Sequence, residues 1–196
     1  EYIEMWLTDA GLATSPDWRV RYDEWLDYFS ALGITGIGMG WITVTRAERE
    51  QPDVHLESWP YAVEQPVSAA LGARASALTL ASLSDADLLT RRLVVPDDVT
   101  QETLGRPGAV DPEHIVLRSA SGLRRAMEVD TALGGVLGAC DGDLTLGQIM
   151  AGVAGVLDVD NATVVEATLP GVRRAIRDAL LLDTAPPARH GRGGAL

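Results

Sequence analysis

The sequence predicts an α+β fold in two parts: a short first part of helices and one strand, and a mainly helical second part that contains a β-hairpin. Three observations predict it. Aromatic residues recur at helical spacing near the N-terminus. A run rich in β-branched residues and glycine follows at 34–46. Farther on, two short β-like segments, 115–118 and 123–129, precede a series of helical patterns that ends near residue 183.

Two helices are expected before the glycine-rich run. The first covers 2–10, where apolar residues recur at helical spacing and Gly11 follows. Ser15 suits the cap of the second helix and Pro16 its first position, while Gly33 ends it. Its broad apolar face consists of Trp18, Tyr22, Trp25, Phe29 and Leu32.

Residues 34–46 predict one long strand. Gly36, Gly38 and Gly40 alternate with larger residues, so they share one face of that strand, where a neighbour packs closely or the strand bends. The same glycines superficially resemble a nucleotide-binding loop. Such a loop leads into a helix whose N–H groups meet the phosphate, whereas more strand-like sequence follows here. The pattern therefore favours a structural strand.

The proline-bearing, charged segment 47–66 predicts a linker between two domains. The first domain is then 1–46 and the second is 67–183, because the composition shifts from aromatic to Ala, Leu, Val and Asp after the linker. The tail 184–196 has too little apolar content to fold and is expected to be disordered.

The second domain opens with helical sequence. Residues 68–93 predict at least one helix, with Ser84 or Asp85 near its start, and 97–104 predicts another short one. The segments 115–118 and 123–129 then predict a hairpin, because the turn between them contains Gly122, which tolerates a positive φ.

Helices follow the hairpin. The first is expected over 131–139. Thr145 and Gln148 have the spacing of a capping box and open a helix to about residue 157. Asn161 starts a further short helix, and Pro170 is expected to open the last one.

A hairpin followed by three helices is compatible with a winged-helix-like domain, in which the last helix can recognise nucleic acid. Many such domains serve only in protein interaction or dimerisation. The candidate nucleic-acid-binding residues lie on the hairpin and the last helix: Arg124, Arg125, Arg173, Arg174 and Arg177. The formal net charge of −12 instead favours a solvated helix face, since nucleic-acid surfaces need clustered positive charge.

No catalytic, cofactor-binding or metal-binding residue is predicted. Cys140 is expected to be a structural thiol, because no neighbour would lower its pKa. His55, His114 and His190 lack metal-ligand spacing. The acidic pairs Asp85/Asp87, Asp97/Asp98 and Asp141/Asp143 lie near presumed helix or turn boundaries, where carboxylates serve as caps.

Composition favours the cytoplasm. No apolar run approaches the roughly 20 residues that cross a bilayer, and a single cysteine excludes an internal disulfide. The N-terminus is acidic where a signal peptide would be basic. The first residue is Glu1 within an amphipathic helical pattern, so the sequence is expected to be part of a longer chain.

Several stretches, in this order, resemble the C-terminal region of an actinobacterial family of S-adenosylmethionine-dependent methyltransferases, related to release-factor glutamine and small-ribosomal-RNA methyltransferases. They are EYIEMWLTDAG at 1–11, YDEWLDYF at 22–29, GIGMGWIT at 36–43, ESWP at 57–60, VEQP at 63–66, DPEHIVLR at 111–118 and GACDG at 138–142. The resemblance covers roughly residues 1–183.

This resemblance implies a Rossmann-like catalytic domain upstream, which would bind S-adenosylmethionine and carry an Asn-Pro-Pro-Tyr-type motif; neither that motif nor the cofactor loop occurs here. Residues 1–46 would be the closing elements of that fold, with 34–46 as its final strand, and 60–183 an appended domain. The expected partners are the upstream domain, a protein or nucleic-acid substrate, and a second copy of the chain paired through strand 34–46. Alone, this segment would bind no cofactor and have no activity.

Overall fold

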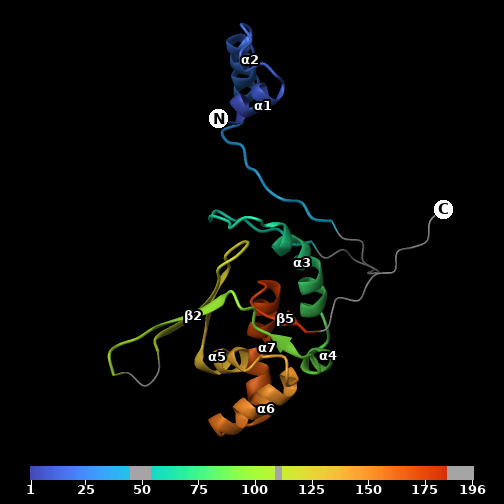
Figure 1. Ribbon diagram of the computed structural model, residues 1–196, viewed down its shortest axis with the longest axis vertical. Helices are drawn as coiled ribbons and strands as arrows, with labels where there is room; N and C mark the ends of the chain where they lie inside the picture. The colour runs from blue at the N-terminus through green and yellow to red at the C-terminus, as the bar shows by residue number, and fades with distance from the viewer. Residues whose placement is uncertain (45–53, 109–111, 185–196) are drawn as a thin grey trace, which may run out of the picture. The chain divides into compact units, whose positions relative to one another are not determined.

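A computed structural model describes residues 1–44, 54–108 and 112–184. The chain divides into two compact units, Glu1–Val44 and Thr45–Leu196. The described part of the chain contains both helices and strands, so the predicted α+β class is confirmed (Figure 1). Each unit is described by itself below.

The first unit consists of two helices and an extended segment. The helices are α1 (Tyr2–Asp9) and α2 (Trp18–Ala31), as the spacing predicts. Helix α1 buries Ile3 and Leu7, whereas α2 has no buried residue. The aromatic face of α2 is partly buried, and its Phe29 ring lies with its centroid 6.3 Å from that of Tyr2 on α1.

The predicted strand 34–46 is wrong over its described part. Residues 34–44 have no regular secondary structure and pair with none of the strands in the described ranges; 45 and 46 lie outside those ranges. A Cβ built on Gly36, Gly38 or Gly40 would meet nothing within 4 Å. The sequence carries strand propensity, but a strand forms only when a neighbour accepts its backbone hydrogen bonds, and this unit supplies none.

The second unit contains five helices and five strands among the described residues. The helices are α3 (Ser68–Ala81), α4 (Asp85–Leu89), α5 (Thr131–Gly138), α6 (Leu146–Leu157) and α7 (Asn161–Arg177). The strands are β1 (Leu93–Val94), β2 (Val99–Leu104), β3 (His114–Ser119), β4 (Ala126–Val129) and β5 (Leu182–Asp183).

Strands β2, β3 and β4 form an antiparallel sheet in that order. The predicted hairpin is β3–β4, and Gly122 in its turn has φ 57°. The helix expected over 97–104 is wrong, because β2 occupies this segment and pairs with β3 from Val99↔Ser119 to Leu104↔His114. Its β-branched residues, Val99 among them, fit a pleated strand once β3 is alongside.

Strands β1 and β5 form a separate two-stranded sheet that the sequence did not predict. Leu93 pairs with Asp183 and Val94 with Leu182, and Val94 also forms an isolated bridge with Asp141. This sheet joins the segment after α4 to the segment after α7. Strands of two residues are too short to show a period of alternation, so sequence patterns do not reveal them.

Two helix caps of the second unit lie at the predicted residues, whereas the predicted start of the second helix at Ser15 and Pro16 is wrong: α2 begins at Trp18, and its N-cap Asp17 makes no side-chain cap bond. Ser84 caps α4 by accepting the N–H of Asp87, and Thr145 and Gln148 form the predicted capping box of α6. The predicted break at Pro170 is wrong, since α7 runs continuously through it from Asn161 to Arg177. Buried residues lie on α7 both before and after the proline, so packing keeps the helix intact despite the lost backbone donor.

The core of the second unit lies between helices α5, α6 and α7 and the inner face of the larger sheet. Its fully buried large side chains include Leu88, Leu93, Val136, Leu137, Leu146, Met150, Val172, Ile176, Leu180 and Leu181. Each such side chain contributes about 1.5–3 kcal/mol when it leaves water. No helix in the described residues is long and apolar enough to cross a membrane.

Part of the predicted linker 47–66 packs on the second unit. Residues 47–53 lie outside the described ranges. Farther on, the backbone N–H of Glu64 donates to the carbonyl of Gly122 over 2.7 Å, and the Glu57 carboxylate binds Arg125. The segment from Glu57 to Pro66 is therefore attached to this unit. Of the tail 184–196, expected to be disordered, Thr184 is ordered and donates to the Arg92 carbonyl, while 185–196 lie outside the described residues.

Candidate functional site

The five predicted nucleic-acid-binding arginines occupy different environments. Arg124 is exposed in the hairpin turn with φ 50°, whereas Arg125 beside it is only 8% exposed. Arg174 and Arg177 are exposed near the end of α7, while Arg173 is half-buried. The structure thus brings Arg125, Arg174 and Arg177 to one pocket but leaves Arg124 and Arg173 outside its lining.

Arg125 is held on several sides. Its Nη1 and Nη2 atoms donate to the two carboxylate oxygens of Glu57, both over 2.5 Å, and Nη1 also lies 3.2 Å from Oδ1 of Asp178. Its guanidinium carbon lies 4.7 Å from the centre of the Trp59 ring. The paired, planar geometry is the one in which Arg binds carboxylate most strongly.

The pKa shifts of Glu57 and Arg125 both favour the charged form of the group. The hydrogen bond from Arg125 is the main reason that the pKa of Glu57 lies below its usual range, although partial burial opposes it. The same bond is the main cause of the raised pKa of Arg125. Both groups are therefore charged across the ordinary pH range, and their attraction fastens the segment around Glu57 to the hairpin.

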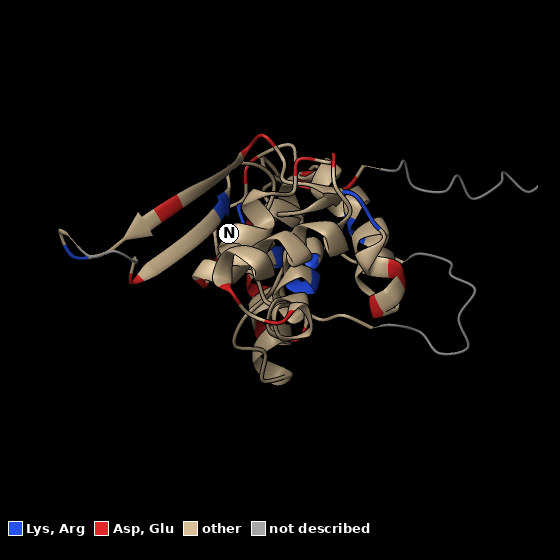
Figure 2. Ribbon diagram, turned by 90° about the horizontal axis from the view of Figure 1, so that it is seen from below, with Lys and Arg blue, Asp and Glu red and all other residues tan. Residues whose placement is uncertain are grey.

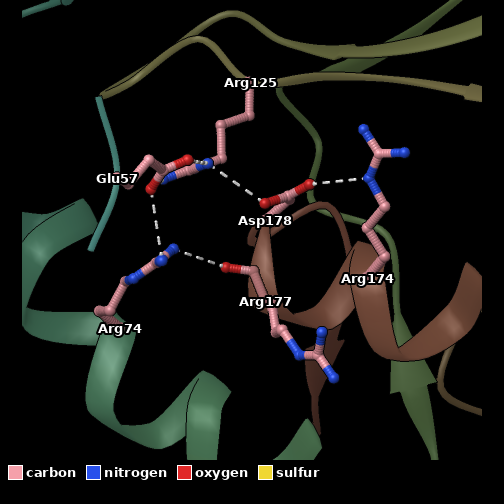
Figure 3. A network of polar contacts seen from close by, with 6 residues as sticks. All are labelled: Glu57, Arg74, Arg125, Arg174, Arg177 and Asp178. Atoms are coloured by element: carbon pink, nitrogen blue, oxygen red, sulfur yellow. Dashed lines mark hydrogen bonds and ion pairs between the residues drawn. The ribbon is translucent and has the colours of Figure 1, made fainter. Parts of the chain in front are cut away.

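Carboxylates and guanidinium groups alternate in a continuous series, which we name the arginine–carboxylate chain. It runs in the order Arg74, Glu57, Arg125, Asp178 and Arg174. The two outer links are longer than the central ones: 3.4 Å from Nη2 of Arg74 to Glu57, and 3.6 Å from Nε of Arg174 to Asp178. Figure 3 shows Glu57 and Asp178 on either side of Arg125.

Local structure explains why these residues meet. Arg125 follows two left-handed positions, Gly122 and Arg124, which turn the chain between β3 and β4. Gly122 also lies close to α3, since a Cβ there would come within 2.8 Å of Ala70. Asp178 is the residue at which α7 ends. Four segments distant in sequence therefore contribute to one site: the segment around Glu57, α3, the hairpin turn and the end of α7.

The arginine–carboxylate chain borders a pocket of about 380 Å³. Four arginines line it against two carboxylates, and His55 and Trp59 complete much of the wall. The indole N–H of Trp59 is buried and has no acceptor within the described part of the chain. Arg74 is fixed further by donating from Nη1 to the Arg177 carbonyl over 3.1 Å.

Arg173 has a structural role. Its Nη1 donates to the Ala81 carbonyl at the end of α3, and its Nη2 binds Oδ1 of Asp85 in the first turn of α4, both over 2.5 Å. The Arg173 side chain is 18% exposed. It therefore connects α7 to the junction between α3 and α4 and has little surface left for a phosphate.

These pairings weaken the case for a nucleic-acid surface. Arg125, Arg173 and Arg174 all face carboxylates. Figure 2 shows acidic segments interspersed with basic ones along the ribbon. A surface that binds a phosphate backbone needs several unneutralised cations side by side. Four of the five arginines are better described as parts of structural pairs or of one pocket, and Arg124 is exposed in the hairpin turn.

The other chemically reactive residues have structural surroundings. Burial is the main cause that raises the pKa of Cys140 to about 12, and its Sγ lies 3.2 Å from the Val136 carbonyl as a weak donor. A thiol with such a pKa is a poor nucleophile. Across the described ranges, no group of three or more His, Cys, Asp or Glu side chains is placed to hold a metal ion.

The acidic pairs serve local structure, as their positions suggested. Asp85 and Asp87 lie in the first turn of α4. Asp98 accepts from the hydroxyls of Ser119 and Ser121, and the bond from Ser121 is the main reason that its pKa is lowered. Asp141 accepts the N–H of Asp143 in a turn. His114 pairs with Glu128 on the hairpin, and His190 lies outside the described residues.

Sequence reasoning missed Glu57, Arg74 and Asp178, which complete the pocket. They are single charged residues in three separate segments, and nothing in their spacing links them. Comparison of the chain with protein-family models, with curated proteins and with solved structures found no match.

Proposed function

We propose that this chain is the C-terminal part of a cytoplasmic S-adenosylmethionine-dependent N-methyltransferase that acts on protein or nucleic acid. In this proposal the first unit closes an upstream catalytic domain, and the second unit is a winged-helix-like appended domain that helps to orient the substrate. The family resemblance of the stretches between residues 1 and 142 suggests the enzyme class. The chain's own residues supply no methyl-transfer site.

One observation carries the proposal: within the first unit as the structure describes it, residues 34–44 pair with no strand and expose several large apolar side chains. Met39, Trp41, Ile42 and Val44 are each more than half exposed, and Ile42 is 94% exposed. A monomeric protein rarely leaves so many neighbouring large apolar residues in water. A sheet edge would bury these side chains and satisfy the backbone of 34–44 together.

The glycines of this segment fit the same role. In an extended strand, Gly36, Gly38 and Gly40 would lie on one side, and no atom in the described structure lies within 4 Å of a Cβ built on any of them. A segment that inserts at a sheet edge under a packed helix needs such a flat side. The proposal therefore assigns 34–44 as a strand that forms when the catalytic sheet is present.

The appended unit would contribute binding and positioning. Methyl transfer proceeds in line and depends on holding the acceptor nitrogen against the methyl group, so a substrate-orienting domain can act without a catalytic side chain. The hairpin β3–β4 and the helices α5 to α7, which share one buried core, would supply the scaffold for that role. The five arginines support it weakly, because most of them are already paired.

The natural reading frame before Glu1 provides the first test. A glycine-rich cofactor loop and an Asn-Pro-Pro motif there support the proposal, and their absence contradicts it. The second test compares Ile42→Asp with Val156→Asp, which replaces an apolar residue that is 86% exposed on the second unit. Both variants are made in residues 1–196 alone and in the longer natural chain.

In the chain of 196 residues, both variants should leave the unfolding temperature nearly unchanged, since both side chains are already in water. In the longer chain, Ile42→Asp should abolish S-adenosylmethionine binding measured by calorimetry, while Val156→Asp should not. Equal effects of the two variants in the longer chain would refute the assigned role of 34–44.

A second copy of the chain is the rival partner for the same segment. In that case the chain of 196 residues dimerises, and Ile42→Asp dissociates the dimer. Sedimentation over a concentration series distinguishes the two: a strict monomer removes the dimerisation hypothesis. A dimer that Ile42→Asp disrupts would favour a dimerisation module over the closing of a catalytic domain.

A further inference from the structure

We propose that the pocket beside the arginine–carboxylate chain binds a small molecule through a phosphate monoester group. The proposal is independent of the methyltransferase assignment, because every residue that carries it belongs to the second unit. Its first support is local charge. The chain as a whole is strongly acidic, with a formal net charge of −12, yet four arginines and two carboxylates line this pocket.

The positive charge that remains after pairing lies on the outer arginines of the pocket and not on Arg125. Glu57 and Asp178 each bridge two guanidinium groups, so Arg125 between them is neutralised from both sides. Arg74 and Arg174 end the series, and each has only one long ion-pair contact. The Arg177 side chain has no carboxylate partner in the described part of the chain, and Figure 3 shows its guanidinium turned away from Glu57.

A phosphate monoester matches this excess of two positive charges. It carries about −1.5 to −2 charges near neutral pH and three acceptor oxygens, and guanidinium groups bind it through paired hydrogen bonds. Arg177 and Arg174 project from neighbouring turns of the end of α7, three residues apart. A rotation of these two long, exposed side chains toward Arg74 would surround one phosphate without disturbing the central pair.

The pocket also has a place for the rest of a small molecule. Its volume of about 380 Å³ lies in the range of small-molecule sites, roughly 300–1,000 Å³. Trp59 lines it and has a buried indole N–H that lacks an acceptor in the described structure. A buried donor without a partner is costly, and a ligand oxygen would remove that cost. The concave shape distinguishes this site from the extended cationic face that a nucleic-acid backbone requires.

The test titrates the chain of 196 residues with glycerol 2-phosphate, inorganic phosphate and acetate, while sodium chloride keeps the ionic strength constant. The readout is the indole N–H resonance of Trp59 in a ¹⁵N-labelled sample, identified by its loss in Trp59→Phe. Glycerol 2-phosphate should shift this resonance saturably, and acetate should not. Arg177→Gln should weaken binding by about tenfold, as expected for one charge-assisted hydrogen-bonding group.

Arg92→Gln is the matched control, because Arg92 is also exposed and lies outside the pocket lining. It should change the affinity by less than about twofold, the effect of a distant surface charge. An unchanged unfolding temperature verifies that Arg177→Gln is folded. The proposal is overturned by the absence of a saturable shift, by equal effects of the two variants, or by equal binding of acetate. Binding of inorganic phosphate alone would refute the organic monoester.

Discussion

The two units differ in whether their apolar residues form a buried core. The first unit contains most of the aromatic side chains, yet α2 buries none of its residues and only Ile3 and Leu7 of α1 are buried. The second unit has few aromatics and a continuous core of Leu, Val, Ile, Met and Ala. Apolar content therefore does not make a core by itself. A core forms where a second layer covers the apolar face, and only the second unit has that layer.

The largest expected effect tests this contrast directly. Leu137→Ala removes a side chain of the second unit that is 1% exposed, and Leu32→Ala removes the same side chain from the first unit, where it is 57% exposed. Leu137→Ala should lower the free energy of unfolding by about 3 kcal/mol. Leu32→Ala should change it by less than about 0.5 kcal/mol. Urea unfolding followed by circular dichroism measures both.

A comparable loss from both leucines would mean that the first unit shares a core with some other surface. A chain that includes the proposed upstream catalytic domain would sharpen the comparison. If that domain covers the first unit, the effect of Leu32→Ala should rise toward that of Leu137→Ala.

The second prediction concerns Arg125, whose ion pairs join Glu57 and Asp178 in the second unit. Arg125→Ala leaves the Glu57 and Asp178 carboxylates without their shared partner in a half-buried site. The free energy of unfolding should fall by about 2 kcal/mol, less than for a fully buried pair because Glu57 retains access to water. Arg125→Lys is the control that keeps the charge but loses the paired geometry, so it should recover only part of the loss.

The Glu57–Arg125 pair also predicts a loss of stability at acidic pH. The pKa of Glu57 is lowered in the folded state, so the pair's stabilising contribution is complete above the unfolded pKa of Glu and is lost as the pH falls through the lower folded value. A stability curve of Arg125→Ala that parallels the unmodified protein between pH 6 and 3 would contradict this account.

The elements that the sequence predicted correctly are those with local signals. The capping box of Thr145 and Gln148 and the caps at Ser84 specify helix starts through contacts within four residues. The hairpin turn at Gly122 likewise depends on one local backbone conformation. In the first unit, the apolar spacing and the terminal glycines Gly11 and Gly33, both with positive φ, predicted α1 and α2, but the cap expected at Ser15 did not form.

The errors have one physical cause: at these positions, contacts with other segments of the chain determine the structure, and the local sequence pattern does not. Residues 34–44 have strand propensity without a neighbour, whereas Val99–Leu104 has a weaker pattern but pairs with β3. The same holds for the site. Arg125 was identified as a surface cation, but its partners Glu57 and Asp178 come from other segments, and no spacing in the sequence joins them.

The third prediction concerns Pro170, where the sequence predicted the start of a new helix but α7 is continuous. Pro170 is exposed within α7, and it deprives that helix of one backbone donor. Pro170→Ala should raise the free energy of unfolding by about 1 kcal/mol, since the restored N–H and helix propensity exceed the loss of proline's restriction of the unfolded chain. Thermal unfolding measures the change, with Ala167→Pro as the opposing control. A destabilised Pro170→Ala would indicate that the proline ring itself makes a required contact.

The smallest expected effect concerns an exposed pair on strands β3 and β4 of the second unit. His114 and Glu128 pair across β3 and β4, with Nδ1 and Oε1 2.5 Å apart, and the hydrogen bond to Glu128 is the main cause of the raised pKa of His114. A raised folded-state pKa stabilises the protein fully below the unfolded value of about 6.5 and not above the folded value. The unfolding temperature of the unmodified protein should therefore exceed that of His114→Gln at pH 5.5, and the difference should shrink as the pH rises to 8.5. Glu128→Gln is the control, since it removes the main cause of the raised pKa and should lower the unfolding temperature with the same pH dependence. A difference that is constant with pH would show that the pair is held by its geometry and not by the histidine charge.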